Sequence, residues 1–272
     1  MNKLNVYIST CDSNLFIIKY FQHFFNKYWS KDINVKILGF TPPNFKLENN
    51  FEFISMGKEQ VGGAKGWTNY LIDFFSSIKD EHYVFGLDDF MISRPVDIEV
   101  FETCLGLLDE NVGRIDLQPS LQYARDSNFV KPYTEKNGIK FLSLVDSGRG
   151  TNLYQNAAAF SIWNREWFLK NIKRDWSPWD WEITGSMSLA DGDGYDVIGS
   201  VDRWAIKKME VLSSQWPGII NVRGSLAYSR RMRAKSMEAR IRAWPSRSAI
   251  RSSSRRVGKE ALISFFFIES FS

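Results

Sequence analysis

The chain has 272 residues and a net charge of +4, and 44% of its residues are hydrophobic. This hydrophobic content is sufficient for a folded core and excludes a wholly disordered chain. No stretch reaches the roughly 18 consecutive apolar residues that a membrane-spanning helix needs. The first residues also lack a charged region followed by a long apolar segment, so we expect no signal peptide.

The charge is divided unevenly, because residues 228–272 hold 11 basic and 3 acidic side chains. This segment, the basic tail, carries +8, so residues 1–227 carry −4 and the overall charge does not indicate nucleic-acid binding. The tail also ends in an apolar stretch, residues 263–268. Two interpretations remain open, a peripheral contact with a membrane or a disordered or foreign ending. The two cysteines, Cys11 and Cys104, suit a reducing compartment.

Strand-like and helical patterns alternate over the first half of the chain. Strands are predicted for residues 4–9, 33–40, 51–54 and 83–87, and helices for the segments 14–29 and 68–78 between them. Strands separated by helices of about 10 to 15 residues predict a parallel α/β sheet. In such a sheet, ligands bind beyond the carboxyl ends of the strands.

A third helix is expected from Asp97, with its apolar face formed by Ile98, Phe101, Leu105 and Leu108. The second half then mixes extended and helical segments. We predict strands at 114–118, 195–201 and 210–212, an extended region over 123–144 with a turn near residues 137–138, an apolar segment 157–163 with a helix to about 173, and a helix over 176–188.

Three polar features follow the predicted strands and should meet at one edge of the sheet. They are the loop Thr10–Ser13, the glycine-containing loop Gly57–Gly66 with Lys65, and the pair Asp88-Asp89. Two acids between apolar segments are costly to bury unless something binds them, and a divalent cation with oxygen ligands is a common solution. The alternative is a solvated pair of acids in a turn, but the convergence of three loops favours a binding site.

Seven of the ten tryptophans lie between residues 163 and 216. We expect most of them in the core and only Trp179 or Trp181 at a surface where an aromatic ring can stack on a sugar. The acids Asp180 and Glu182 stand beside them. A carboxylate whose pKa is raised by neighbouring rings suits a general base. The alternative is an acidic first helical turn, favoured by the helix dipole.

Three segments together resemble the GT-A glycosyltransferases of bacterial surface-polysaccharide and lipopolysaccharide synthesis. They are Leu87–Phe90, Asn156–Asn164 and Trp179–Ser186. The resemblance covers residues 1 to about 227. It implies an α/β fold with a mostly parallel, Rossmann-like central sheet flanked by helices, a nucleotide-sugar half at about 1–118, and an acceptor half at about 119–227.

The resemblance implies transfer of a sugar from a nucleotide-sugar donor to a hydroxyl of a glycan or lipid-linked glycan, in the cytoplasm or at the inner face of the membrane. No nucleic-acid partner is implied. The implied roles are donor binding by Thr10, Asp12, Lys65, Asn69 and Asp88, Mn²⁺ or Mg²⁺ binding by Asp89, acceptor binding by Trp179 and Trp181, and base catalysis by Glu182 with Asp180 as the second choice. The family's metal motif is Asp-any-Asp, and one acid of that pattern is missing here. Asp12 has an alternative role as a helix N-cap.

Two other functions remain open at this point. A nucleotidyltransferase shares the layout of strands and acids, but it would carry a glycine-rich basic signature near the N-terminus, which Ser9–Asp12 lacks. A carbohydrate-binding protein without catalysis would keep the aromatic half alone. Hydrolysis of a nucleotide-sugar would exclude the latter.

Overall fold

In the computed structural model, the described residues are 4–58, 64–118, 130–144, 155–186, 196–201 and 203–206. The chain divides into two compact units, Met1–Glu210 and Val211–Ser272, and every described residue belongs to the first. The basic tail and the strand expected at 210–212 therefore lie outside the described residues, and the domain boundary at 227 stays a prediction. No helix in the described part of the chain is long and apolar enough to cross a membrane.

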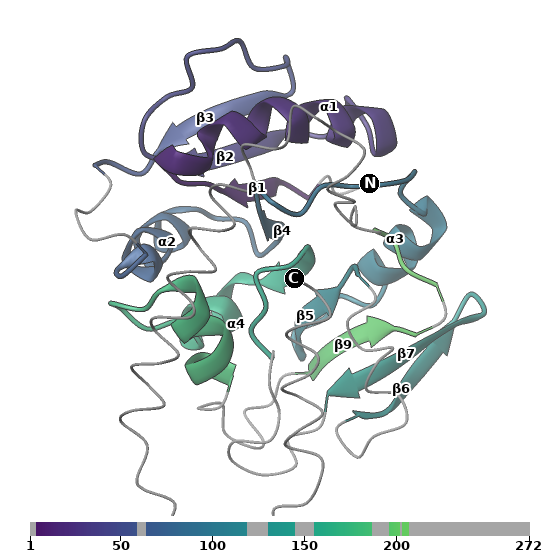
Figure 1. The fold of residues 1–272 in the computed structure, drawn as a ribbon. Helices are drawn as coiled ribbons and strands as arrows, with labels where there is room; N and C mark the ends of the chain where they lie inside the picture. The colour runs from purple at the N-terminus through teal and green to yellow at the C-terminus, as the bar shows by residue number, and fades with distance from the viewer. Residues whose placement is uncertain are drawn as a thin grey trace, which may run out of the picture. The chain divides into compact units, whose positions relative to one another are not determined.

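The described unit is built on one nine-stranded sheet in the order β3-β2-β1-β4-β8-β5-β9-β7-β6 (Figure 1). The strands have the following bounds: β1 Val6–Ser9, β2 Val35–Gly39, β3 Phe51–Ser55, β4 His82–Leu87, β5 Val112–Asp116, β6 Val130–Lys136, β7 Ile139–Leu144, β8 Ser161–Asn164 and β9 Asp196–Ser200.

The first four strands are parallel, as the alternation of strands and helices predicted. β1 pairs with β2 and β4, and β2 pairs with β3. In the second half, β8 runs antiparallel to both β4 and β5, whereas β9 is parallel to β5 and antiparallel to β7. The sheet is thus parallel from β3 to β4 and mixed beyond β4. The insertion of β8 brings residues 155–160 to the carboxyl ends of β4 and β5.

In the described part of the chain, four α-helices cover the two faces of the sheet: α1 Ile18–Tyr28, α2 Trp67–Ser77, α3 Ile98–Leu105 and α4 Arg165–Lys170. Alternate residues of a strand point to opposite faces. In β4, Val84 joins the core cluster that holds α1 and α3, whereas Tyr83 and Phe85 join the cluster that holds α2 and α4. The result is a layered α/β fold, as predicted.

Local signals explain several boundaries. The turn Asn137-Gly138 joins β6 to β7, and both residues have a positive φ, 52° and 71°. This is the backbone that a two-residue hairpin turn needs and that Asn-Gly favours. Asn164 caps α4, because its Oδ1 accepts a hydrogen bond of 3.0 Å from the amide of Trp167.

Helix α3 agrees with the prediction only in part: Phe101, Leu105 and Leu108 pack against the core as expected, but they are not its most buried residues. Val100, Thr103 and Cys104 face the core, whereas Ile98 is 46% exposed. The helix has apolar side chains on two sides, so its sequence pattern did not determine which side faces the sheet. Phe101 is half-buried at the edge of the cluster.

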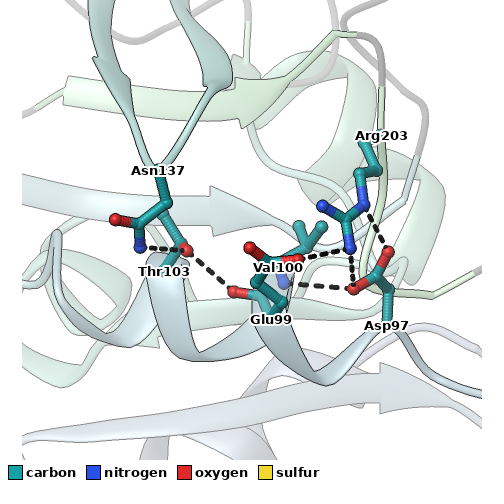
Figure 2. Close-up of polar contacts among 6 residues, drawn as sticks. All are labelled: Asp97, Glu99, Val100, Thr103, Asn137 and Arg203. Atoms are coloured by element: carbon teal, nitrogen blue, oxygen red, sulfur yellow. Dashed lines mark hydrogen bonds and ion pairs between the residues drawn. The ribbon is translucent and has the colours of Figure 1, made fainter.

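Polar contacts connect α3 to two later segments, as Figure 2 shows. Arg203 binds Asp97, the N-cap of α3, through Nε–Oδ2 at 2.7 Å, and it binds Glu99 through Nη2–Oε2 at 2.7 Å. Asn137 of the β6–β7 turn donates to the hydroxyl of Thr103 at 3.0 Å. Arg203 thus holds the start of α3, and Asn137 holds its last turn.

Candidate functional site

The first feature of the candidate site is the carboxyl end of β4, where Asp88 is only 3% exposed. Its backbone amide donates to the carbonyl of Ser9 at the end of β1 (3.2 Å). Its Oδ2 accepts a hydrogen bond of 2.5 Å from the hydroxyl of Thr10, and Asn14 donates to the same carboxyl group. Thr10 and Asp88, which are 78 positions apart in the sequence, are therefore brought together as the parallel topology predicted.

The buried carboxyl group of Asp88 has an unusual electrostatic environment. Its burial, and then the charge of the adjacent Asp89, raise the pKa of Asp88 to about 7, although the hydrogen bonds from Thr10 and Asn14 oppose this rise. The protein therefore holds a carboxyl group that is half-ionised near neutral pH. A bound cation would offset both the cost of burying the negative charge of Asp88 and its repulsion from Asp89.

Asp89 is exposed beside Asp88. Among the described residues, no group of three or more histidine, cysteine and acidic side chains is placed to hold a metal ion. A magnesium site in a nucleotide enzyme needs only one or two carboxylates, because substrate phosphates and water complete the coordination. The adjacent carboxylates fit that requirement, and their mutual repulsion is the observation that favours a cation here.

Asp12 joins the loops that follow β1 and β2. Its Oδ1 accepts a hydrogen bond from the backbone amide of Thr41 (2.9 Å), and its Oδ2 accepts one from the hydroxyl of the same residue (2.7 Å). The interpretation of Asp12 as a helix N-cap is wrong, because the 3-10 helix η1 Asp12–Ile17 begins at this residue, and its N-cap is Cys11. The carboxylate instead fixes the second loop over the site.

The glycine-containing loop is described only in part, because residues 59–63 lie outside the described residues. Lys65 is exposed just before α2, and Gly66 has a φ of 82°. Asn69 makes two hydrogen bonds with Asp175, a side-chain contact of 2.9 Å and one from the backbone amide of Asp175 at 2.8 Å. Asn69 therefore anchors α2 to the segment before the next helix.

Trp67 links the ends of the strands to that later helix. Its indole Nε1 donates to the hydroxyl of Ser9 at 3.0 Å, and its ring packs against Trp181 with 5.6 Å between ring centroids. Ser9 directly precedes Thr10 at the end of β1, and Trp181 directly precedes Glu182. One side chain therefore connects the surroundings of the acid pair with the helix that carries the predicted base.

That later helix, η3 Asp180–Gly185, has π-helical hydrogen bonding, a feature often found at functional sites. Glu182 lies half-buried on it, and its Oε1 accepts a hydrogen bond of 2.7 Å from the amide of Ala158. Asp180 instead exchanges contacts with Ser177: its Oδ2 accepts from the hydroxyl at 2.7 Å, and its amide donates to that hydroxyl at 3.1 Å. The backbone amide of Ser177 also donates to Asp180 Oδ2 at 3.2 Å, which completes a capping box. The structure thus gives Asp180 the helix-start role that was the alternative interpretation.

The two candidate acceptor tryptophans differ in environment. Trp179 is 43% exposed. Trp181 has no exposed surface, and its ring lies among Trp163, Phe168 and Trp67. We therefore correct the assignment of Trp181 as an acceptor contact, because a ring enclosed by other rings offers no face to a sugar.

The prediction missed a buried ion pair at the carboxyl end of β5. Arg114 and Asp116 are each 1% exposed, and Arg114 Nη2 lies 3.1 Å from Asp116 Oδ1. The only sequence signal was the presence of two charged residues in an otherwise apolar strand, Val112–Asp116. Charged residues are rarely buried without a specific reason.

No protein-family model matches the sequence, and no curated protein matches it. Solved structures to which this chain is similar include three glycosyltransferases. The bifunctional WbbM enzyme is 11% identical with a TM-score of 0.39, and the match covers 72% of this chain and 38% of that one. GlyE of Streptococcus pneumoniae TIGR4 is 13% identical with a TM-score of 0.36 over 72% of this chain and 45% of that one.

The third structure, the galactosyltransferase LgtC in complex with donor and acceptor sugar analogs, is 12% identical with a TM-score of 0.39. That match covers 71% of this chain and 73% of LgtC. The present chain thus spans less than half of the first two proteins. Similarity of this degree does not specify a reaction.

Proposed function

We propose that this protein is a glycosyltransferase that moves a sugar from a nucleotide-sugar donor to a hydroxyl of a surface glycan or lipid-linked glycan. The observation that carries the proposal is the link through Trp67, which contacts Ser9 beside the buried Asp88 on one side and the helix of Glu182 on the other. A transfer between two substrates requires a donor site and an acceptor site held in a fixed relation. The Trp67 link supports such a relation.

The donor site in this proposal lies at the carboxyl ends of β1, β2 and β4. The nucleoside would bind over the loops joined by Asp12 and Thr41, with the sugar or ribose near Asp88. Lys65 and Asn69, at the start of α2, stand on the side where the diphosphate would lie. The lysine would share the negative charge that develops on the leaving nucleoside diphosphate.

Asp89, with Asp88 beside it, would hold Mg²⁺ or Mn²⁺. Such an ion, when bound, stabilises the charge of the leaving diphosphate as a Lewis acid. The chain's own contribution is to keep two carboxylates adjacent and to hold Asp88 rigidly through Thr10. The raised pKa of Asp88, about 7, supports this role, because it shows that the negative charge of the carboxylate is costly in the absence of a cation.

Glu182 would act as the general base that takes the proton of the attacking acceptor hydroxyl. It is fixed by the amide of Ala158 and remains half-buried. Trp179 is the ring that would contact the acceptor, since it is exposed three residues before Glu182. Asp180 is the weaker choice for the base, because its carboxylate and its backbone amide both make hydrogen bonds to Ser177 at the start of the helix.

The first experiment is a thermal-shift screen of the full chain with UDP-, GDP- and CMP-sugars, each with Mn²⁺ or with EDTA. A ligand that binds the folded state at 100 times its Kd adds about 2.7 kcal/mol of stability. We expect one donor to raise Tm selectively and Mn²⁺ to increase that shift. Equal shifts with Mn²⁺ and EDTA would remove the metal from the proposal, and no shift with any donor would contradict it.

The second experiment replaces Glu182 with Gln and measures the release of nucleoside diphosphate. The amide can still accept the hydrogen bond from Ala158, so donor binding should remain, whereas turnover should fall by about 10² to 10⁴ because the base is lost. The matched control is Glu166→Gln in the first turn of α4, which should leave both unchanged. Full turnover in the Glu182 variant would refute the base assignment.

A further inference from the structure

The buried Arg114 has more contacts than an ion pair needs. Its Nη2 lies 3.1 Å from Asp116 Oδ1, and its Nη1 donates to the backbone carbonyl of Gln155 at 2.6 Å. Its guanidinium also lies over the ring of Trp163, 5.4 Å from the centroid. Asp116 is held in turn by the hydroxyl of Ser161 at 2.9 Å. The cation is therefore held by three partners, and one of them, Asp116, is itself held by Ser161.

The carbonyl of Gln155 belongs to the segment that binds Glu182. Three residues later in that segment, the amide of Ala158 donates to Glu182 Oε1 at 2.7 Å. Between them, the amide of Asn156 donates to the hydroxyl of Ser186, one residue beyond η3, at 2.9 Å. The short segment 155–158 is thus held by Arg114 at one end, and it holds the π-helix at two points.

A further steric contact tightens this arrangement. A Cβ added to Gly185 would lie 2.8 Å from the side-chain nitrogen of Asn156, which is too close for any larger residue at position 185. Asn156 is fully buried, and its side-chain amide also reaches the carbonyl of Trp181 at 3.4 Å. The helix and the segment are therefore in close contact at Gly185 and Trp181, on either side of Glu182.

We propose that Arg114 is the positioning residue for Glu182: it fixes the segment whose amide binds the carboxylate, and its buried positive charge favours the charged form of that carboxylate. The same attraction also affects Arg114. Burial lowers the pKa of Arg114, and the negative charges of Asp116 and, to a smaller extent, Glu182 oppose this fall. The inference rests on the proposed role of Glu182 as the base, and it assigns Arg114 no contact with substrate.

Other charged groups surround the same helix. Asp116 comes from β5, Asp180 lies on the helix itself, and Lys173, Arg174 and Asp175 lie in the preceding segment. Asp180 is held by Ser177, Asp175 by Asn69, and Arg174 by the exposed Asp73. Among the described residues, Arg114 is the buried cation in this group.

The test compares the full chain with the double variant Arg114→Gln/Asp116→Asn, which removes both charges and leaves no unpaired ion in the core. Loss of the cation disfavours the charged form of Glu182, whereas loss of Asp116 removes a repulsion that acts in the opposite direction. The variant also loses the contact from Arg114 to Gln155 that holds the amide of Ala158 on Glu182. The lost attraction and the lost amide contact together should make the carboxylate take up its proton at higher pH. We expect the acidic limb of the kcat profile to move to higher pH, with about a tenfold loss of kcat at pH 6 and a smaller loss at pH 8.5. The donor KM should change by less than about twofold.

A second readout does not depend on turnover. In full chains labelled with ¹³C-glutamate, the signal of Glu182 is identified by its loss in Glu182→Gln and is then titrated in both backgrounds. Its midpoint should move to higher pH in the double variant. An unmoved midpoint would overturn the inference even if activity fell. Conversely, full turnover by Glu182→Gln would refute the base role while leaving the measured coupling between Arg114 and Glu182 in place.

Two further variants complete the design. Arg114→Lys keeps the charge but not the fork that reaches Asp116 and Gln155 together, so kcat should fall about threefold at all pH values with an unmoved acidic limb. If the double variant does not fold, Arg114→Lys becomes the test, and an unchanged kcat in Arg114→Lys would overturn the inference. Arg203→Gln, which removes an exposed arginine bound to Asp97 and Glu99 (Figure 2), should leave the profile and the midpoint unchanged.

Discussion

Replacement of Asp88 with Asn should stabilise the cation-free protein at alkaline pH. In the folded chain Asp88 has a pKa of about 7, against an ordinary value of 3.8, because it is buried beside Asp89. A folded state that holds the proton more tightly than the unfolded chain loses stability as the pH rises from about 4 to about 7. Asn has nearly the same shape and carries no charge, so it removes this loss.

The magnitude follows from the two pKa values. Their difference of roughly 3, at 1.36 kcal/mol for each pH unit, gives a cost of about 4 kcal/mol at pH 8 and about 1 kcal/mol at pH 4.5. The neutral amide loses about 1 kcal/mol of hydrogen bonding to Thr10 and Asn14. We therefore expect Asp88→Asn to be about 3 kcal/mol more stable than the native chain at pH 8 and nearly equal to it at pH 4.5.

The assay is urea unfolding in EDTA at pH 4.5, 6 and 8, and the quantity compared is the difference in the free energy of unfolding between variant and native chain. Asp89→Asn is the matched control. Because Asp89 is exposed, its replacement should change the free energy of unfolding little by itself. It removes the charge that raises the pKa of Asp88, however, so the free energy of unfolding should depend less on pH. A difference for Asp88→Asn that stays constant from pH 4.5 to pH 8 would refute the reasoning. Addition of Mn²⁺ at pH 8 should stabilise the native chain more than the variant.

Two further predictions concern burial. Trp181→Ala should lower the free energy of unfolding by about 3–5 kcal/mol, because it leaves a cavity at a position with no exposed surface. Trp179→Ala should change the free energy of unfolding by less than about 0.5 kcal/mol, because Trp179 is exposed. Equal effects of the two variants in urea unfolding would contradict the burial pattern. Burial, and then Asp116, raise the pKa of Cys104 to about 12. A thiol reagent at pH 8 should therefore modify only the half-buried Cys11 in the native chain and both cysteines in guanidinium chloride, and modification of both in the native chain would be evidence against a closed core around α3.

Several features of the site could be read from residues that lie close together in the sequence. Apolar runs ending in polar residues placed Thr10 and Asp88 at the carboxyl ends of their strands, and the parallel topology implied that they would meet, as their 2.5 Å hydrogen bond confirms. The Asn137-Gly138 turn was likewise predictable, because a positive φ at both positions suits few other residue pairs.

Other features required the tertiary structure, because they depend on partners that are distant in sequence. Local pattern allowed Asp12 to be a helix cap, but the proximity of Thr41 made it a link between two loops. The same limit applies to α3, where apolar residues on two sides left the buried face undetermined until the sheet was in place.

The sequence by itself determined where the acids and tryptophans stand along the chain, and hence which segments end at the edge of the sheet. The tertiary structure decided which of these side chains are accessible and which serve packing: Trp181 lies in the core, Asp180 caps its helix, and Arg114 stabilises the segment that binds Glu182. The physical reason is that burial and charge pairing arise between elements. Strand β8, for example, lies between β4 and β5 and so brings residues 82–85 and 114–116 together with residues 161–164, which no local pattern connects.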